Sequence, residues 1–352
     1  MTRITECGKI PISDRVVIAR EAHNLRGLLR KSPLSHSGGN IMDDKKFMTY
    51  DEQLSFLSED KKLIIPDREK ALSLLKKHSY FALINGYKFP FKRNDGTYRL
   101  NTKIDDIYHL YSFDNNLRFL LMQSIMEVEI HIKSLLSYAF CEKFGEEDSA
   151  YLSTTNYNYI PTHQQGINEL VGKLTDILKD CQSFSYMKHQ KDNHNNIPLW
   201  VMVKALTLGN ISKMYSFQQP NIQTKISKEF KDVTEDDLGA FLNLLTRFRN
   251  VCAHNERLFN YRYNRFNINN MPIHKKLCLK KGNHYKQGKS DFFAALISLK
   301  YLLPAESFDV LAVKVSEEIE KLLYNTSQIQ RSQLYKYMGL PQSWFDIKDI
   351  SI

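Results

Sequence analysis

The chain has 352 residues, of which 42% are hydrophobic and 25% are charged, so it can bury a sizeable core and is not a disordered protein. Its 49 lysine and arginine residues exceed its 39 aspartate and glutamate residues, and the net charge of +10 is compatible with a polyanionic partner such as nucleic acid. The longest apolar runs, such as Leu199 to Val203, are far shorter than the ~18 residues of a membrane span, and the N-terminus carries no pattern typical of a secretory signal.

The five cysteines are widely spaced and form no Cys-x-x-Cys pair, which argues against a disulfide framework and against structural zinc. The sequence also has no phosphate-binding loop, dinucleotide fingerprint or His-x-x-x-His pair. We therefore expect a cytoplasmic protein without membrane spans, cofactors or bound metal.

Glycine and proline are scarce, at 14 and 10 residues, whereas sandwiches and barrels need many tight turns. The sequence therefore predicts an all-α fold with at most one small hairpin. Residues 1–48 contain a Ser/Gly/Pro-rich linker after a basic segment, and we interpret them as a poorly ordered extension, with a basic binding arm as the alternative. Residues 346–352 are expected to form a tail.

The folded part begins near Thr49, and a helix is predicted from Pro66-Asp67 to about Lys77. The Asn94-Asp95-Gly96 turn predicts a small hairpin within residues 87–100. Apolar residues then recur at spacings of three and four from Leu117 to Ala139, which predicts a long helix capped by Asp114 and ending before Gly145.

More helices are predicted in the second half of the chain. They cover residues 167–178, the segment from Pro198 to about Gly209-Asn210, residues 291–303 and residues 306–324, with a stop at Gly339-Leu340-Pro341. Thr234 and Asp237 form a predicted capping box for a further helix that runs past Phe248.

This last helix ends in a run of polar residues that invites a chemical interpretation. Arg249 falls within the apolar stripe, where an unpaired charge is costly, and Asn250 and His254 share a flanking face. An arginine can clamp a phosphate and stabilise a charged transition state, and a histidine can transfer protons near neutral pH. The set suits metal-independent cleavage of RNA, but by spacing alone a structural arginine and a core histidine are the commoner explanation.

Geometry adds a constraint, because Arg249 and His254 lie about 140° apart on a regular helix. Either the helix is distorted at this point, or two copies of the chain pool their residues in a dimer.

Sequence blocks beyond this run strengthen the enzymatic interpretation. The segment from Arg249 to Leu258 resembles the signature of the Abi-like (AbiD/AbiF) abortive-infection family, which is similar to the HEPN superfamily of helical ribonucleases. The resemblance extends over about residues 49 to 345. It is carried, in the family's order, by Tyr50-Asp51-Glu52-Gln53-Leu54, Ile65-Pro66-Asp67, Ile84-Asn85-Gly86-Tyr87, Leu110-Tyr111-Ser112-Phe113-Asp114, Pro198-Leu199-Trp200 and Met338-Gly339-Leu340-Pro341.

The resemblance implies an Abi-like helical domain over 49–345 with a HEPN-like bundle at about 105–262, and an endoribonuclease that acts in phage defence or as a toxin. Arg249, Asn250 and His254 match the catalytic positions. A homodimer with a composite site and a small structured regulatory RNA are implied partners. Glu256 stands where nucleotidylated HEPN toxins carry a tyrosine, so that form of control is not implied here.

Other residues are weaker candidates. Glu129 and Arg247 are expected to support the site, Glu129 by pairing with Arg249, although Glu129 is equally compatible with a solvent-exposed position. A basic stretch predicts contacts with RNA phosphates, with a solvated loop as the alternative; its lysines are Lys275, Lys276, Lys280, Lys281, Lys286 and Lys289. A cysteine nucleophile at Cys252 is the least favoured alternative. Two functions of another class stay open: a non-catalytic RNA-binding protein and a protein-interaction scaffold.

Overall fold

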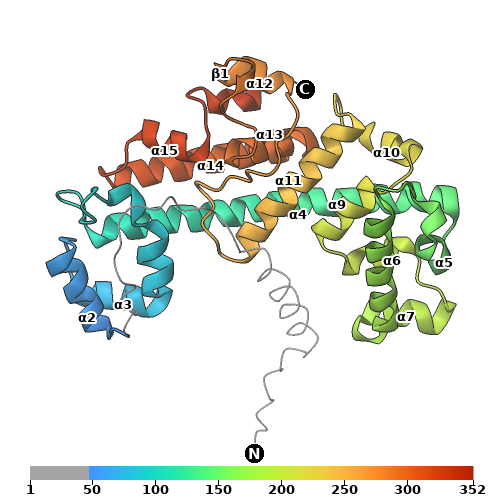
Figure 1. The fold of residues 1–352 in the computed structure, drawn as a ribbon, viewed down its shortest axis with the longest axis horizontal. Coiled ribbons are helices and arrows are strands. Elements are labelled where there is room, and N and C mark those ends of the chain that lie inside the picture. The colour runs from blue at the N-terminus through green and yellow to red at the C-terminus, as the bar shows by residue number, and fades with distance from the viewer. Residues whose placement is uncertain (1–46, 352) are drawn as a thin grey trace, which may run out of the picture.

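The computed structural model describes residues 47–351, and the extension predicted for residues 1–48 lies almost wholly outside this range. One helix, α4 (Ile104–Phe144), runs through the length of the molecule and organises the rest (Figure 1). Its apolar residues repeat at spacings of three and four and are buried over nearly the whole helix. As predicted, α4 ends at Gly145, whose φ of +86° suits a residue without a side chain.

Two helices pack along α4. α14 (Ala305–Asn325) lies antiparallel to it, because Asn116 donates to Glu318 (2.7 Å) near one end of the contact and Ser307 donates to Glu127 (2.8 Å) near the other. α11 (Glu235–Ala253) crosses α4 (Figure 1) and begins with the predicted capping box of Thr234 and Asp237. The all-α prediction is confirmed for the described residues.

The remaining elements cover the two ends and one side of this core. The helices before α4 are α2 (Tyr50–Ser55), η1 (Phe56–Asp60), α3 (Arg68–His78), η2 (Phe81–Asn85) and η3 (Phe89–Phe91). Between α4 and α11 lie α5 (Asp148–Leu152), η4 (Thr154–Asn156), α6 (Gln164–Lys179), η5 (Cys181–Ser183), α7 (Ser185–His194), α8 (Leu199–Met202), η6 (Val203–Ala205), α9 (Leu208–Ser216) and α10 (Pro220–Ser227). After α11 come α12 (Pro272–Leu277), β1 (Lys280–Lys281), β2 (His284–Tyr285), α13 (Phe292–Leu302), α14, α15 (Arg331–Met338) and η7 (Trp344–Asp349).

Several local predictions were wrong. Asp114 does not cap α4, which begins ten residues earlier; it is a fully buried residue inside the helix. The Asn94-Asp95-Gly96 turn is flanked only by an isolated bridge between Lys92 and Tyr98 and not by two paired strands. The expected first strand cannot form because Phe89–Phe91, which includes Pro90, is a 3₁₀ helix. The two-stranded hairpin is instead β1–β2.

Two boundaries also differ. Gly209-Asn210 does not end the helix that follows Pro198, since α9 starts there with Thr207 as its N-cap. Residues 346–351 do not extend away as a tail: residues 346–349 complete η7, whose Trp344 and Ile347 are buried and which packs against α12, α13 and α14.

Gly339 ends α15 in the left-handed conformation, with φ +74°, as its place in the sequence predicts. Its neighbourhood adds a second reason for glycine, because a Cβ at this position would lie 2.1 Å from the Asp291 carboxylate. The contact joins the end of α15 to the N-cap of α13.

Candidate active site

The C-terminal end of α11 carries the predicted catalytic residues, and its geometry follows from a helix stop. His254 is the C-cap, and Asn255 adopts the left-handed conformation with φ +53°. The Asn255 amide donates to the Cys252 carbonyl (3.2 Å) and the Glu256 amide donates to the Val251 carbonyl (3.0 Å). These two bonds form a Schellman motif, so the chain leaves the helix directly after His254.

Arg249, Asn250 and His254 line one cleft of about 820 Å³. The opening lies between α6, α9, α11 and the loop at residues 266–269. Because the helix ends at Ala253, the angular separation expected for Arg249 and His254 does not keep them apart: one chain brings both to the same cleft. The end of the helix is thus the expected departure from a straight helix, and a site composed of two chains stays a prediction.

These three side chains are unengaged within the described part of the chain. His254 is exposed and Arg249 and Asn250 are half-buried, and none of the three side chains makes a hydrogen bond or an ion pair with residues 47–351. A structural arginine on an apolar stripe normally has an acidic partner. Arg249 has no acidic partner among these residues. The free-energy cost of partly removing its charge from water can therefore be offset by an anion that binds in the cleft.

The lining of the cleft is polar and basic. Lys173, Lys213, Arg247 and Arg249 contribute four cations against the single carboxylate of Asp236. Thr207, Asn210, Ser212, Ser216, Asn243, Thr246, Asn250 and Asn269 supply hydroxyls and amides, and Phe266 adds an aromatic ring. This chemistry matches a phosphate backbone with attached bases better than an apolar small molecule.

Asn210 lies in the wall of the cleft. The residue is 9% exposed, and its Nδ2 is buried without a hydrogen-bond partner among the described residues. A buried amide nitrogen without a partner is uncommon in native structures. Gly209 lies beside it, and a Cβ there would approach the Thr246 side chain at 3.3 Å, so glycine lets α9 pack closely on α11.

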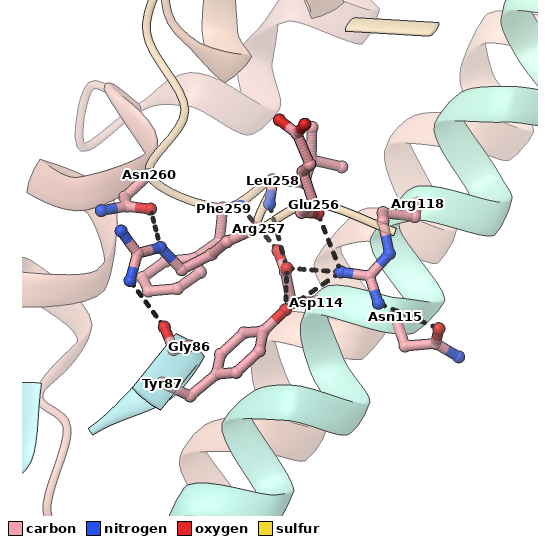
Figure 2. Close-up of polar contacts among 10 residues, drawn as sticks. All are labelled: Gly86, Tyr87, Asp114, Asn115, Arg118, Glu256, Arg257, Leu258, Phe259 and Asn260. Carbon is pink, nitrogen blue, oxygen red and sulfur yellow. Dashed lines mark hydrogen bonds and ion pairs between the residues drawn. The ribbon is translucent and has the colours of Figure 1, made fainter. Parts of the chain in front are cut away.

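The segment after the motif is fixed by a buried polar network centred on Asp114 (Figure 2). The Asp114 carboxylate accepts hydrogen bonds from the backbone amides of Leu258 (3.0 Å) and Phe259 (2.6 Å) and from the Tyr87 hydroxyl (2.6 Å). Arg118, four residues further along α4, pairs with it at 2.7 Å. Burial raises the pKa of Asp114, whereas Arg118 and these donors counteract that rise by stabilising the carboxylate.

Arg118 and Arg257 complete this attachment. Arg118 donates to the Glu256 carbonyl (3.2 Å) and to Asn115 (3.0 Å). Arg257 donates to the Gly86 carbonyl and to Asn260 (2.7 Å) (Figure 2). Its guanidinium also lies over the Phe89 ring, 4.7 Å from the ring centroid. Residues 256–260 are thus fastened to α4 and to the segment before it, which fixes the turn that carries His254.

Sequence reasoning missed this network. Tyr87 and Arg257 lie in family-like blocks without an assigned role, Asp114 was predicted only as a helix cap, and Arg118 was not singled out. The signal available was the i, i+4 spacing of Asp114 and Arg118 on a helix that is otherwise apolar on that side.

The supporting residues expected from the sequence behave differently. Arg247 lines the cleft and lies over the Tyr263 ring at 5.1 Å. The expected pairing of Glu129 with Arg249 is wrong, because Glu129 pairs with Lys133 one turn along α4 (2.7 Å). Burial raises the pKa of Cys252 to about 12, so its thiol stays protonated and is a poor nucleophile.

The predicted RNA-binding lysines lie in α12, the β1–β2 hairpin and the segment after it. Lys275, Lys276, Lys280 and Lys286 are exposed, Lys281 belongs to β1, and Lys289 is half-buried. His274, within the same stretch, is structural: it accepts from the Met271 amide at Nδ1 (2.9 Å), and its Nε2 lies 2.7 Å from the Gly288 carbonyl, to which it donates as the neutral tautomer. Burial lowers the His274 pKa to about 4.

Across residues 47–351, no group of three or more His, Cys, Asp and Glu side chains is arranged to hold a metal ion. None of the helices in this range is both long enough and apolar enough to span a membrane.

Comparison with known proteins identifies the family. No curated protein and no solved structure matches the chain significantly. A family model described as Abi-like protein matches residues 73–260, which is more than half of the chain and includes α4, α11 and all the residues that line the cleft except Phe266 and Asn269. The chain therefore belongs to the Abi-like family, which associates it with abortive infection, a form of phage defence.

Proposed function

We propose that this protein is a metal-independent endoribonuclease of HEPN type that acts as an effector in phage defence or as the toxin of a toxin–antitoxin pair. The observation that carries the proposal is that Arg249 and His254, at one end of a core helix and in one basic cleft, have no side-chain partner within residues 47–351. Structural residues of these types would be paired or sealed, as Arg118 and His274 are.

The chemistry follows from the residue types. The ribose 2′-oxygen attacks the adjacent phosphorus, the bond from phosphorus to the 5′-oxygen breaks, and the products are a 2′,3′-cyclic phosphate and a free 5′-hydroxyl. His254 removes the proton from the 2′-hydroxyl or delivers one to the leaving 5′-oxygen. Arg249 stabilises the extra negative charge on the phosphate oxygens, and Asn250 donates a neutral hydrogen bond beside it.

A second function is favoured by the basic lining alone. A non-catalytic member of the same family would hold a small RNA in the cleft through Lys173, Lys213 and Arg249 and would not cleave it. The two functions share RNA binding, so only turnover separates them.

A homodimer belongs to the proposal. Phe119, Met126 and Ile130 lie on one face of α4 at spacings of seven and four, and they are 68%, 53% and 68% exposed. Half-exposed Trp200 adjoins this face and lines a groove with Ile130. An exposed apolar face of this kind suits contact with a second copy across a two-fold axis. A small structured regulatory RNA that covers the same face or the cleft would hold the protein inactive.

The test is incubation of purified protein with total RNA in EDTA, beside the variants His254→Ala and His194→Ala; His194 is an exposed histidine at the end of α7 and does not line the cleft. Cleavage that persists in EDTA, is lost with His254→Ala and is retained with His194→Ala supports the nuclease. Tight binding without cleavage supports the RNA-binding alternative, and absence of RNA binding contradicts both.

A further inference from the structure

A second basic pocket lies next to the cleft. Its volume is about 280 Å³, and Arg262, Lys286 and Lys289 line it together with His284. Its one carboxylate belongs to Asp291, whose side chain is only 1% exposed. Pockets for drug-sized ligands begin at about 300 Å³, so the volume and the cations of this pocket suit an anionic group of about the size of one nucleotide unit.

The Asp291 carboxylate is already occupied by internal donors. It accepts hydrogen bonds from the backbone amides of Gly288 (3.0 Å) and Ala294 (3.1 Å) and pairs with Arg262 at 3.3 Å. Burial also raises the pKa of Asp291 to about 6. Its negative charge is therefore largely compensated within the fold, and the open side of the pocket is dominated by cations.

Two of these cations are placed to receive an anion. Lys289 is half-buried, and its ammonium donates to Asn270 at 2.8 Å, which fixes its direction. Burial lowers the pKa of Lys289, so an anion beside it would recover interaction energy that the ammonium loses by leaving water. Lys286 is exposed, and its side chain has no partner within residues 47–351.

One loop forms the wall between the pocket and the cleft. Phe266 and Asn269 line the cleft, whereas Asn267 and Asn270 line the basic pocket. Backbone hydrogen bonds hold this loop beside the segment that carries Lys289: the Tyr263 amide donates to the Ser290 carbonyl, and the Ile268 amide donates to the Lys289 carbonyl, both at 2.9 Å. The two sites are therefore adjacent and fixed relative to each other.

We propose that this pocket, formed by Arg262, Lys286 and Lys289, binds a backbone phosphate of the same RNA strand whose scissile phosphate lies beside Arg249 and His254. The inference rests on the proposed function for its ligand class. A strand that leaves the cleft across the loop at residues 266–270 reaches the pocket directly, and phosphate contacts of this kind set the position of the strand without reading its sequence.

The test measures binding in EDTA with full-length protein that carries His254→Ala, so that no RNA is cut. Unstructured, fluorescein-labelled RNA oligonucleotides of increasing length are titrated against this protein, with and without Lys286→Glu. The matched control is Lys188→Glu, the same charge reversal at an exposed lysine of α7 that lines neither the pocket nor the cleft. A second variant, Lys289→Ala, probes the half-buried cation, with its folding checked by thermal melting.

Short oligonucleotides that fill only the cleft should bind equally well to all variants. Beyond a threshold length, Lys286→Glu and Lys289→Ala should weaken binding roughly three- to tenfold, and the log–log salt slope should fall by about 0.7 for each phosphate that the variant no longer neutralises. Lys188→Glu should not change the threshold. An equal loss at every length, an equal loss in the control, or no RNA binding would overturn the proposal.

A free anion is the other source of a phosphate group. Titration of the protein with AMP by calorimetry should give no tight binding. If AMP binds tightly, if Lys286→Glu abolishes that binding, and if RNA binding shows no length threshold, the pocket is a site for a free nucleotide and the proposal is contradicted. The nuclease proposal is judged separately. If RNA binding shows the length threshold but the wild-type protein does not cleave RNA, the pocket proposal holds and the nuclease proposal is contradicted.

Discussion

Arg118 and Arg249 both project from helices of the core, and their surroundings are opposite. Arg118 is 4% exposed and bonded to Asp114, Tyr87, Asn115 and the Glu256 carbonyl, with only its Nε left without a partner among the described residues. Arg249 is half-buried in an open cleft and has no partner within residues 47–351. The comparison indicates that the first arginine stabilises the fold and that the second is available to a ligand.

The largest expected effect is a loss of RNA cleavage when a residue of the open cleft is replaced. His254→Ala or Arg249→Ala should lower the cleavage rate by a factor of roughly 10² to 10⁴, since each removes a group that acts in the transition state. The free energy of unfolding should change by less than ~0.5 kcal/mol with His254→Ala, because this side chain is exposed and unbonded. Single-turnover cleavage and urea unfolding of the same preparations check both values. A large loss of stability would return these residues to a structural role.

A substitution in the buried network of Asp114 and Arg118 should instead lower the stability of the fold. Asp114→Ala removes the partner of Arg118 and two acceptors for the Leu258 and Phe259 amides, so it should destabilise the protein by about 3–5 kcal/mol. Asp236→Ala is the matched control, because Asp236 is an aspartate at the open cleft and should cost less than ~0.5 kcal/mol. Equal unfolding midpoints in urea for the two variants would contradict this assignment.

Asp291 is a second buried carboxyl group, and it should make the free energy of unfolding depend on pH. Burial raises its pKa from 3.8 to about 6, so between these values the folded protein binds more protons than the unfolded chain. Its contribution therefore makes stability fall as the pH rises toward and through 6. Asp291→Asn cannot titrate, and the difference in unfolding free energy between wild type and variant should shift by about 1–1.5 kcal/mol from pH 5 to pH 7. A pH-independent difference would mean that Asp291 is ionised throughout.

The smallest effect is expected at Glu129. Its pairing with Lys133 is a single i, i+4 contact on α4 and is separate from Arg249. Glu129→Ala should therefore leave cleavage unchanged and cost no more than ~0.5 kcal/mol. A marked loss of cleavage in a standard activity assay would restore the expected link to Arg249.

Much of the fold follows from local patterns. Three features depend only on residues that are close together in the sequence: the apolar period of α4, the capping box at Thr234 and the helix end at Gly339. The structure has each of them where the sequence predicts it. Asp114 shows the limit: an aspartate before an apolar run is typical of an N-cap, and its true role depends on Leu258 and Phe259, about 145 residues away.

The candidate site divides in the same way. Arg249, Asn250 and His254 are close in sequence, and the motif identified them together. Asn210, Lys213 and Lys173 join them only because α6 and α9 pack beside α11, and no short-range signal marks them. The pocket of Arg262 and Lys289 likewise depends on backbone bonds between two distant loops.

The central claim is that the cleft of Arg249 and His254 cleaves RNA by attack of the ribose 2′-hydroxyl. The most direct test maps one cleavage site in EDTA and then replaces the nucleotide 5′ to that site by its 2′-deoxy form in an otherwise identical RNA. The account predicts that wild-type protein leaves a 2′,3′-cyclic phosphate on the unmodified RNA, that the 2′-deoxy RNA is bound but not cut, and that His254→Ala cuts neither. Cleavage of the 2′-deoxy RNA, or undiminished cleavage by His254→Ala, would contradict it.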